Sequence, residues 1–369
     1  MKSEINKPTI IIDELKCKKN ISEMSLKAKI NKLNLRPHFK THQSHQIGRW
    51  FMQEGIDRIT VSSFDMAEYF SNDGWKDITV AFPANIREID MINSLSKKIN
   101  LNILISDTFT LSFLENNLRH QTGFYIKIDT GYHRSGIDYK NIAEIDNLIK
   151  MSYNSSNLKF KGFLTHAGNT YNTVDKEEVI SIHNNNLCIM NDLKKRYKPE
   201  WPEIQISIGD TPSCSISDNF DGIDEIRPGN FVFYDLMQQN IGSCDFEDIA
   251  IVLACPVVSL DNNSNKIIIL GGAIHLSKES MLNKNGEKIF GRIVRFNSNY
   301  SWESPEPDLY VNSISQEHGI INANKEFINN VQIGDIIGIL PVHSCLTANL
   351  MARYTSLSGN IIDHFSSRK

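Results

Sequence analysis

Short apolar, β-branched runs alternate with amphipathic stretches over the first two thirds of the chain. The runs occupy residues 35–41, 56–62, 77–81, 101–106, 124–129, 160–165, 204–208 and 223–226. Between them lie patterns of helical period, for instance at residues 44–53, 66–72, 86–98, 141–151 and 176–195. Eight strand and helix units, within about the 250 residues that this architecture takes, predict a (β/α)8 TIM barrel.

A doubly wound open sheet shares this alternation, but it needs a glycine-rich turn after its first strand. The first strand here runs into HFKTH, which favours the barrel. After about residue 245, strand-like runs follow one another without helical patterns, at residues 250–260, 266–272, 309–315 and 335–341. We therefore expect a barrel over residues 13–242 and a β-rich domain over residues 243–369, which a strand within residues 1–12 joins.

The charge balance excludes some functional classes. The 369 residues include 39 basic and 43 acidic side chains, so the formal net charge is −4, which argues against a nucleic-acid binder. No apolar run has the length of a membrane helix, and the N-terminus lacks the apolar core of a secretory signal. We expect a cytoplasmic protein without membrane contact. The 6 cysteines are scattered, which indicates neither a disulfide scaffold nor a zinc ribbon.

Barrel enzymes carry their chemistry at the C-terminal ends of the strands. The first run ends in RPHFKTH, and strict alternation places Arg36, His38, Lys40 and His42 on one face. Crowded positive charge in a dry site depresses the pKa of a lysine and makes it a nucleophilic amine. Lys40 is therefore the candidate nucleophile, and a solvated strand edge is the alternative interpretation.

The seventh and eighth runs are followed by SIGDTPS and RPGNFVFYD. In barrels the loops at these two positions frequently hold a phosphate through backbone N–H groups. Gly209, Thr211, Gly229 and Asn230 suit that task, although glycine turns of any purpose look similar. A reactive lysine together with a phosphate cradle indicates pyridoxal 5′-phosphate (PLP), which has an aldehyde at one end and a phosphate at the other.

The β-rich domain contributes a second candidate, in the segment ILPVHSCLT. His343 and Cys345 stand two residues apart, hence on one face of an extended segment, and imidazole and thiolate are ligands that zinc prefers. Two ligands are a weak signal, and a buried core cysteine is the alternative.

Seven motifs in order resemble one family. RPHFKTH, DTGYHRSG, GFLTHAGNTY, SIGDTPS, EIRPGNFVFYD, SQEHG and PVHSC resemble the D-threonine aldolase and D-serine dehydratase family of alanine-racemase-like (fold type III) PLP enzymes. The resemblance covers about residues 12–364 and implies a PLP-binding barrel, a β domain and a homodimer.

The resemblance also implies roles for individual residues. Lys40 matches the lysine that holds PLP as a Schiff base. The residues implied around the cofactor are His38, Arg134, His166, Tyr171, Ser207, Gly209, Thr211, Gly229, Asn230 and Tyr234. His343 and Cys345 match a divalent metal pair, and the soft thiolate favours zinc over manganese or magnesium. The segment GGAIHLSKE at residues 271–279 and Asp210 depart from the family pattern, which leaves the substrate open.

We therefore expect a PLP-dependent, metal-assisted lyase that acts on a small D-3-hydroxy amino acid, with dehydration of D-serine type favoured. Cleavage of D-threonine type, giving glycine and an aldehyde, is the alternative. An amino-acid racemase needs acid and base groups on both faces of Cα and has no use for a metal at the β-hydroxyl. A non-catalytic PLP carrier also uses a barrel lysine, but it lacks a second domain and a metal pair.

Overall fold

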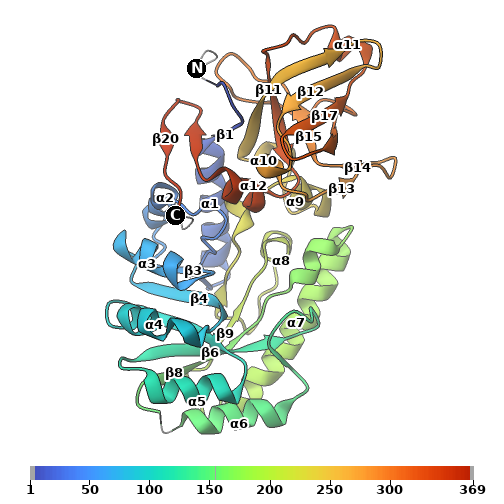
Figure 1. The fold of residues 1–369 in the computed structure, drawn as a ribbon. Helices are drawn as coiled ribbons and strands as arrows, with labels where there is room; N and C mark the ends of the chain where they lie inside the picture. Colours follow the sequence, from blue (N-terminus) through green and yellow to red (C-terminus); the bar gives the residue numbers. More distant parts are fainter. Residues whose placement is uncertain (1–4, 154, 366–369) are drawn as a thin grey trace. The chain divides into compact units, whose positions relative to one another are not determined.

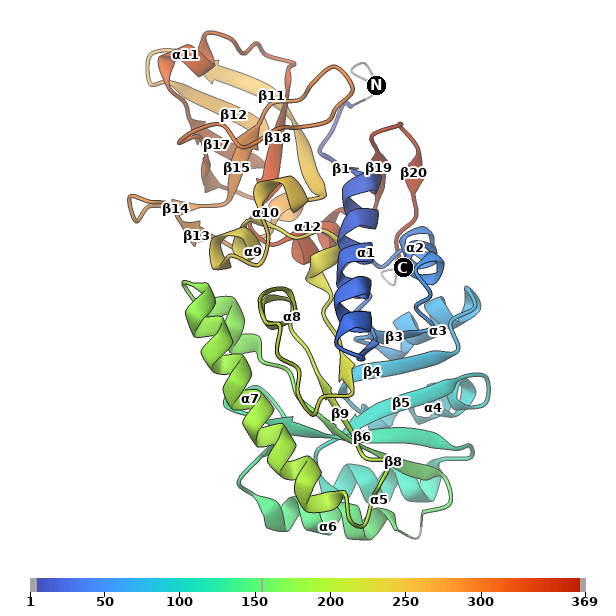
Figure 2. The same cartoon turned by 180° about the vertical axis from the view of Figure 1, so that it is seen from behind.

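A computed structural model describes residues 5–153 and 155–365. Its chain divides into two compact units (Figures 1 and 2). One unit contains Glu23–Lys40 and Phe51–Gly229, and the other contains the chain up to Ser22, Thr41–Trp50 and the chain from Asn230 onward. Within the described residues the chain passes between the units after Ser22, Lys40, Trp50 and Gly229. Residues 1–4 and 366–369, which the expected β-rich domain includes, lie outside the described residues.

The first unit is built on a parallel barrel sheet. Its strands are β2 (Asn34–Leu35), β3 (Arg58–Val61), β4 (Asp77–Pro83), β5 (Asn100–Ile105), β6 (Thr122–Asp129), β8 (Leu158–Leu164), β9 (Gln205–Ile208) and β10 (Glu225–Ile226). The hydrogen-bonded order is β2-β10-β9-β8-β6-β5-β4-β3, and a parallel bridge between His38 and Thr60 joins its two ends. A short strand, β7 (Ile137–Asp138), pairs with β6. The predicted (β/α)8 barrel is confirmed.

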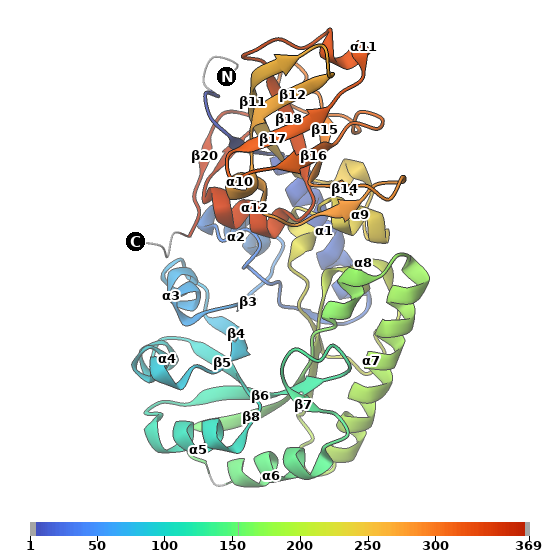
Figure 3. The same cartoon turned by 45° about the vertical axis from the view of Figure 1, so that its right-hand side comes forward.

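Helices follow these strands and cover the outside of the sheet (Figures 1 and 3). They are α3 (Phe64–Asn72), α4 (Ile89–Ser96), α5 (Thr108–Asn117), α6 (Ile142–Ser152), α7 (Lys176–Tyr197) and the short α8 (Thr211–Ile216). Side-chain caps explain several starts: Ser63, Asp107, Asn141 and Asp175 each accept a backbone N–H of the first turn. Helices α1 (Glu14–Ile30) and α2 (His45–Gln53) cross from one unit to the other.

Packing fixes the segment that leads to Lys40. The Phe39 ring is fully buried and lies 4.9–5.0 Å, between ring centroids, from Phe51, Phe70 and Trp75. Burying a phenylalanine side chain contributes about 1.5–3 kcal/mol, so this aromatic cluster anchors the backbone one residue before the lysine.

The second unit is a mixed sheet with short helices. Its strands are β1 (Thr9–Ile12), β11 (Ile251–Asp261), β12 (Lys266–Leu270), β15 (Gly291–Val294), β16 (Val311–Ile314), β17 (His318–Asn322), β18 (Ile336–Pro341), β19 (Tyr354–Ser356) and β20 (Ile361–Ile362). Strand β1 pairs antiparallel with β11 and parallel with β19, and its isoleucines are buried in the core (Figure 2). A separate hairpin joins β13 (Met281–Leu282) and β14 (Lys288–Ile289).

Short helices interrupt this sheet, although the sequence pattern predicts strands alone. They are α9 (Leu236–Ile241), α10 (Ala273–Leu276), α11 (Lys325–Ile328) and α12 (Ser344–Met351). Segments of four to eight residues carry too few turns for a 3.6-residue period to be visible in sequence. No helix within the described ranges is long and apolar enough to cross a membrane.

Candidate active site

Lys40 lies in a turn rather than in a strand. Strand β2 ends at Leu35, and residues 39–42 form turns before Gln43 adopts a left-handed φ of 48°. Pro37 has no N–H for the ladder, which favours an early end of the strand. The predicted alternation is therefore wrong beyond His38: Lys40 is exposed, whereas His42 is fully buried.

Arg36 is not part of a crowded cationic face. Its guanidinium is buried inside the barrel, 2.6 Å from the Glu225 carboxylate and 2.6 Å from the Asp77 carboxylate. Two carboxylates balance its charge, so its role is structural. The expected face of four cationic groups is wrong for two reasons. The strand ends at Leu35, and two carboxylates neutralise the charge of Arg36.

A different set of basic groups gathers in the barrel unit. Burial, and after it the charges of Lys40 and Arg227, hold the pKa of His38 well below its usual range. Burial likewise lowers the pKa of Lys127 to about 7, with Arg227 and Arg134 adding to the effect. Burial lowers the pKa of Arg227 to about 10, so this side chain stays charged at neutral pH. His38 is therefore neutral, whereas Arg227 is a cation that suits an anionic ligand.

His166 is held as a neutral imidazole. Its Nδ1 lies 2.5 Å from the Gly209 carbonyl oxygen, and burial is the main cause that lowers its pKa to about 3. A neutral ring facing a carbonyl carries its proton on Nδ1, which donates, and leaves Nε2 as an acceptor. The rings of Tyr132 and Tyr171 lie 6.2 and 6.3 Å away between centroids. His166 therefore presents a fixed, uncharged aromatic face.

The Arg134 side chain stacks on the ring of Tyr132. The guanidinium carbon lies 5.0 Å from the centre of the Tyr132 ring. That ring packs on Gly168, where an added Cβ would come within 2.2 Å of a ring carbon. Only glycine permits this approach, and the stacked tyrosine restricts where the arginine side chain extends.

The turns after β9 and β10 form one structure. The Thr211 N–H donates to the Tyr171 hydroxyl at 3.2 Å, and the Gly229 N–H donates to the Thr211 hydroxyl at 3.3 Å. Gly209 packs so closely on Arg227 that an added Cβ would lie 2.7 Å from its backbone nitrogen. Four residues expected around PLP, namely Gly209, Thr211, Gly229 and Tyr171, are thus neighbours.

Two side chains beside these turns have other partners. The Ser207 hydroxyl, fully buried in β9, donates to Glu225 and accepts from Arg227. Asp210 caps α8 by accepting the Ser213 N–H at 2.7 Å, and it accepts the Thr170 hydroxyl at 2.9 Å. Burial raises the pKa of Asp210, and the hydrogen bonds from Ser213 and Thr170 oppose that shift.

The second unit brings His343 and Cys345 together, although not on a strand. Strand β18 ends at Pro341, and His343 stands just before α12, whose first turn contains Cys345. The expected extended segment is therefore wrong, because β18 ends at Pro341 and α12 begins at Ser344. The two side chains nonetheless hydrogen-bond.

His343 has the properties of a metal ligand. Its Nδ1 is buried, has no hydrogen-bond partner in the described part of the chain, and lies 3.7 Å from Asp235 Oδ2. Burial lowers its pKa, but the hydrogen bond to Cys345 and the charges of Cys345, Asp235 and Glu279 outweigh burial and raise the pKa to about 9. A divalent cation competes with such a proton for the same donors.

Asp235 organises the surroundings of this pair. Its Oδ2 accepts the Ser344 N–H at 2.9 Å and the Asn230 side-chain N–H at 2.6 Å, and its Oδ1 caps α9 through the Gln238 N–H at 3.0 Å. Asn230 Nδ2 also lies 3.5 Å from Cys345 Sγ. Asn230, which we expected at the phosphate, therefore has its side chain among the partners of Cys345.

Tyr234 also belongs to the second unit, where its backbone adopts a left-handed φ of 49°. A tyrosine in this conformation is strained by about 1–3 kcal/mol, and such strain clusters at functional sites. Its N–H donates to the Asn230 carbonyl at 2.8 Å, which closes the turn between them.

Sequence reasoning missed four residues that the structure places beside the expected ones: Thr41, Lys127, Arg227 and Asp235. Three of them lie inside motifs already singled out, and Lys127 lies two residues before DTGYHRSG, so the motifs locate the regions correctly. Near an irregular strand end, the sequence has no periodic pattern that predicts whether a side chain points into the barrel or away from it. Among residues 5–153 and 155–365, no three His, Cys, Asp or Glu side chains form a ready metal cluster, so the candidate metal site rests on two protein ligands.

Comparison with known protein families identifies the class of this protein. The sequence model described as alanine racemase, N-terminal domain, matches residues 12–236, and the one described as putative serine dehydratase domain matches residues 250–357. The chain therefore contains an alanine-racemase-type barrel, followed by a β domain of the serine dehydratase type. It belongs to the alanine racemase N-terminal domain family, and the resemblance stated from its motifs is confirmed.

Two curated relatives match nearly the whole chain. D-serine dehydratase of Dictyostelium discoideum is 26% identical, and the match covers 100% of this chain and 98% of that protein. D-threo-3-hydroxyaspartate dehydratase of Delftia sp. is 24% identical, with 96% and 95% covered. Both are lyases, as the expected enzyme class requires.

Solved structures agree in fold. The structure of the Delftia dehydratase covers 99% of both chains with a TM-score of 0.90 at 22% identity. A cysteine-to-alanine variant of that dehydratase, described as metal-free, gives a TM-score of 0.91 at 22% identity, with 99% of both chains covered. D-threonine aldolase of Filomicrobium marinum gives 0.84 at 18% identity, with 97% of this chain and 94% of that chain covered.

Proposed function

We propose that this protein is a PLP-dependent, metal-assisted lyase that removes water from a D-3-hydroxy amino acid, with D-serine as the favoured substrate type. The observation that best supports this proposal is the His343–Cys345 pair. The buried Nδ1 of His343 has no hydrogen-bond partner within the described residues. A metal pair of this kind has a purpose in β-hydroxyl chemistry and none in racemisation. The dehydratase names of both full-length relatives support the same class.

PLP fits the barrel unit. When bound, it withdraws electrons from Cα and thereby makes the Cα–H and Cβ–O bonds easier to break. The charged Arg227 and the readily protonated Lys127 suit its phosphate and the substrate carboxylate. Gly209, Thr211 and Gly229, which lie together in the turns after β9 and β10, would surround the phosphate, and the neutral face of His166 suits the aromatic ring.

Lys40 is the residue that we propose to bind the cofactor and to move the substrate proton. Its ammonium is exposed in a turn whose neighbour, Phe39, is locked in the aromatic cluster. The backbone at Lys40 is thereby fixed by its packed neighbour. Once released by the substrate amine, Nζ acts as the base that takes the Cα proton.

A divalent metal, with zinc favoured, fits the second unit. When bound, it acts as a Lewis acid on the β-hydroxyl. His343 and Cys345 provide one nitrogen and one sulfur ligand, and two protein ligands leave positions open for water and substrate oxygen. Asp235 and Asn230 orient this pair, because both contact residues of the 343–345 segment. The products are pyruvate and ammonia in the case of D-serine.

Aldol cleavage to glycine and an aldehyde remains the second candidate, supported by the fold likeness to D-threonine aldolase. It uses the same lysine and the same metal and differs in which bond at Cα is broken. We further propose a homodimer located in the cytoplasm, which sedimentation and cell fractionation test.

The metal pair gives the sharpest test of this function. Replacing Cys345 by Ala should abolish bound metal and turnover of 3-hydroxy substrates, while the PLP content stays near one per chain. Replacing Cys255, a fully buried cysteine of β11, by Ala provides the control, which should keep its metal. A Cys345→Ala protein with full metal content, or full activity after exhaustive chelation, would contradict the proposal.

A further inference from the structure

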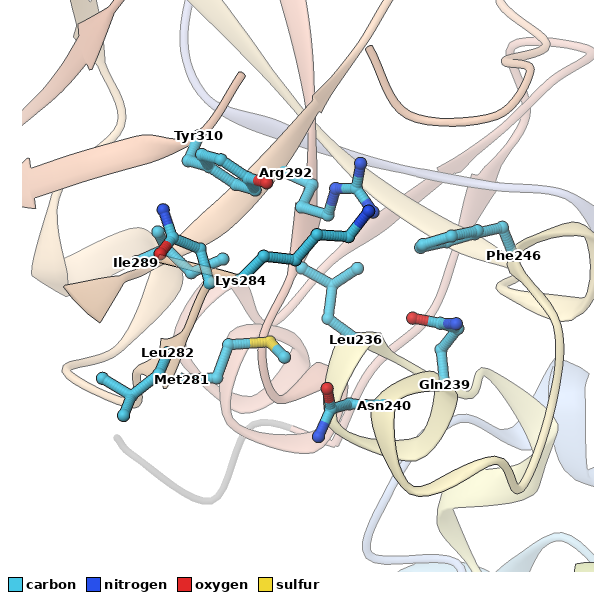
Figure 4. Close-up of a pocket in the computed structure, with 11 residues that line it drawn as sticks. Leu236, Gln239, Asn240, Phe246, Met281, Leu282, Lys284, Ile289, Arg292 and Tyr310 are labelled. Carbon is cyan, nitrogen blue, oxygen red and sulfur yellow. The ribbon is translucent and has the colours of Figure 1, made fainter. Parts of the chain in front are cut away.

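A cavity in the second unit has no part in the chemistry described above. It measures about 380 Å³, within the range of roughly 300–1,000 Å³ that is typical of small-molecule sites. Helix α9, the β13–β14 hairpin and the start of β15 surround it (Figure 4). Its lining consists of Leu236, Gln239, Asn240, Phe246, Met281, Leu282, Asn283, Lys284, Ile289, Arg292 and Tyr310.

The cavity is positively charged. Its lining contains two cations, Lys284 and Arg292, and no carboxylate. Figure 4 shows the Lys284 side chain extended across the cavity toward Arg292. Two cations that face the same space repel each other, and an anion between them removes that repulsion. The nearby Asp308 carboxylate does not line the cavity and accepts a hydrogen bond from the Tyr310 hydroxyl at 3.3 Å.

Arg292 is held in place by two aromatic rings, while the charge of Asp308 acts on it from outside the lining. Its guanidinium carbon lies 4.9 Å from the centre of the Phe246 ring and 5.6 Å from that of Tyr310. Its Nε is buried and lacks a hydrogen-bond partner among the residues that the structure describes. A buried guanidinium N–H without an acceptor is unfavourable. The two rings therefore restrict the plane of the guanidinium that lines the cavity.

The rest of the lining restricts the ligand further. Leu236, Met281 and Ile289 offer an apolar surface, and the amides of Gln239 and Asn240 offer donors and acceptors at its edge (Figure 4). A fully hydrated inorganic anion gains nothing from aliphatic walls, whereas an organic acid buries its hydrocarbon body against them. The guanidinium fork matches a carboxylate in two parallel hydrogen bonds.

We propose that this cavity binds a small organic carboxylate with an apolar body, through Arg292 and Lys284. The inference goes beyond the proposed function and does not depend on it, because none of the eleven lining residues is assigned to PLP, metal or substrate.

Isothermal titration calorimetry of the full chain tests the proposal, with 3-phenylpropanoate as the probe and 3-phenylpropanamide as its uncharged match. The acid should bind at least about tenfold more tightly than the amide, since a charge-assisted pair of hydrogen bonds is worth about 1.5–3 kcal/mol. Arg292→Gln and Lys284→Gln should each weaken binding of the acid by a similar factor. Lys288→Gln, an exposed cation of the same hairpin outside the lining, should bind it as the unaltered protein does.

Lys284 lies between the two hairpin strands, so its substitution tests the site even where loss of the stacked Arg292 impairs folding. Equal affinity for the acid and the amide would overturn the proposal. So would a Lys284→Gln protein that binds the acid as tightly as the Lys288→Gln control does.

Discussion

The Thr41 hydroxyl lies 3.2 Å from the Cys345 sulfur, although 304 residues separate the two in the chain. Thr41 is bonded directly to Lys40, so the candidate cofactor lysine is followed at once by a residue that contacts the candidate metal thiolate. At the other end of the barrel sequence, a candidate phosphate residue is likewise followed by a residue that contacts this sulfur. Gly229 of the phosphate turns is followed by Asn230, whose side chain lies 3.5 Å from the same sulfur.

This contact predicts that Thr41 tunes metal binding. Thr41→Val keeps the shape but removes the hydroxyl, and loss of an outer partner of a metal ligand weakens binding by about 10- to 100-fold. Thr41→Ser, which keeps the hydroxyl, should retain nearly all of the affinity. Competition with a chromogenic chelator measures both. Equal metal affinity in the Val variant and the unaltered protein would show that the contact has no influence.

Lys40 should be the lysine that carries the cofactor. Borohydride reduction of the protein loaded with PLP should fix the label on the peptide that contains Lys40, and Lys40→Ala should remove it. Lys127 is the rival, because it is buried in the same unit and burial lowers its pKa to about 7. Mass spectrometry of the digested protein distinguishes the two. A label on Lys127 would refute the assignment.

His42 should make the fold sensitive to acid. Burial lowers its pKa to about 3; the charge of Asp363 opposes the shift, and that of His364 adds to it. In the unfolded chain its pKa is near 6.5, so between about pH 6.5 and 3 the unfolded state binds the extra proton. The stability is fully present above pH 6.5 and falls by about 1.4 kcal/mol per pH unit as the pH decreases through that window.

Urea unfolding at several pH values measures this slope. His42→Asn keeps an acceptor for the Ser44 N–H. It should reduce the slope of unfolding free energy against pH by the contribution of one proton, about 1.4 kcal/mol per pH unit. The exposed His318, replaced by Asn, provides the control and should leave the slope as it is. An unchanged slope in the His42 variant would contradict the burial argument.

Asp363 should stabilise the segment after Lys40 from the other end of the chain. It accepts the Ser44 hydroxyl at 2.8 Å, the His45 N–H at 2.7 Å and the Gln46 N–H at 3.0 Å, and so caps α2 from outside the helix. Asp363→Ala should cost about 1–2 kcal/mol of unfolding free energy and increase amide exchange at residues 44–47.

Asp261→Ala is the matched control, because Asp261 bonds Ser264 and its neighbours in an exposed turn far along the chain from α2. It should leave exchange at residues 44–47 as it is. Equal exchange in both variants would mean that α2 does not depend on Asp363.

Much of the architecture follows from the sequence pattern. All eight barrel runs overlap strands of the sheet, because buried parallel strands are continuous apolar segments that periodicity detects. The failures occur where the chain leaves regular structure. Pro37 ends β2 before the expected alternation reaches Lys40, and α12 starts at Ser344 where an extended segment is expected.

The candidate site was predictable to the level of motifs but not of side-chain direction. Lys40, His166, His343 and Cys345 stand out by residue type, whereas Asp235 looks like an ordinary helix cap. Its second role, toward His343 and Ser344, depends on a contact across 109 residues that no local pattern encodes. Asn230 likewise has its side chain with Cys345, a contact across 115 residues.

Product analysis tests the central claim most directly. The protein loaded with PLP and zinc is incubated with D-serine, D-threonine, D-threo-3-hydroxyaspartate and D-alanine, before and after chelation. The account predicts a 2-oxo acid and ammonia from 3-hydroxy substrates, loss of that activity on chelation, its return with zinc, and no reaction of D-alanine. Conversion of D-alanine to L-alanine that is indifferent to the chelator, with no turnover of any 3-hydroxy substrate, would contradict it.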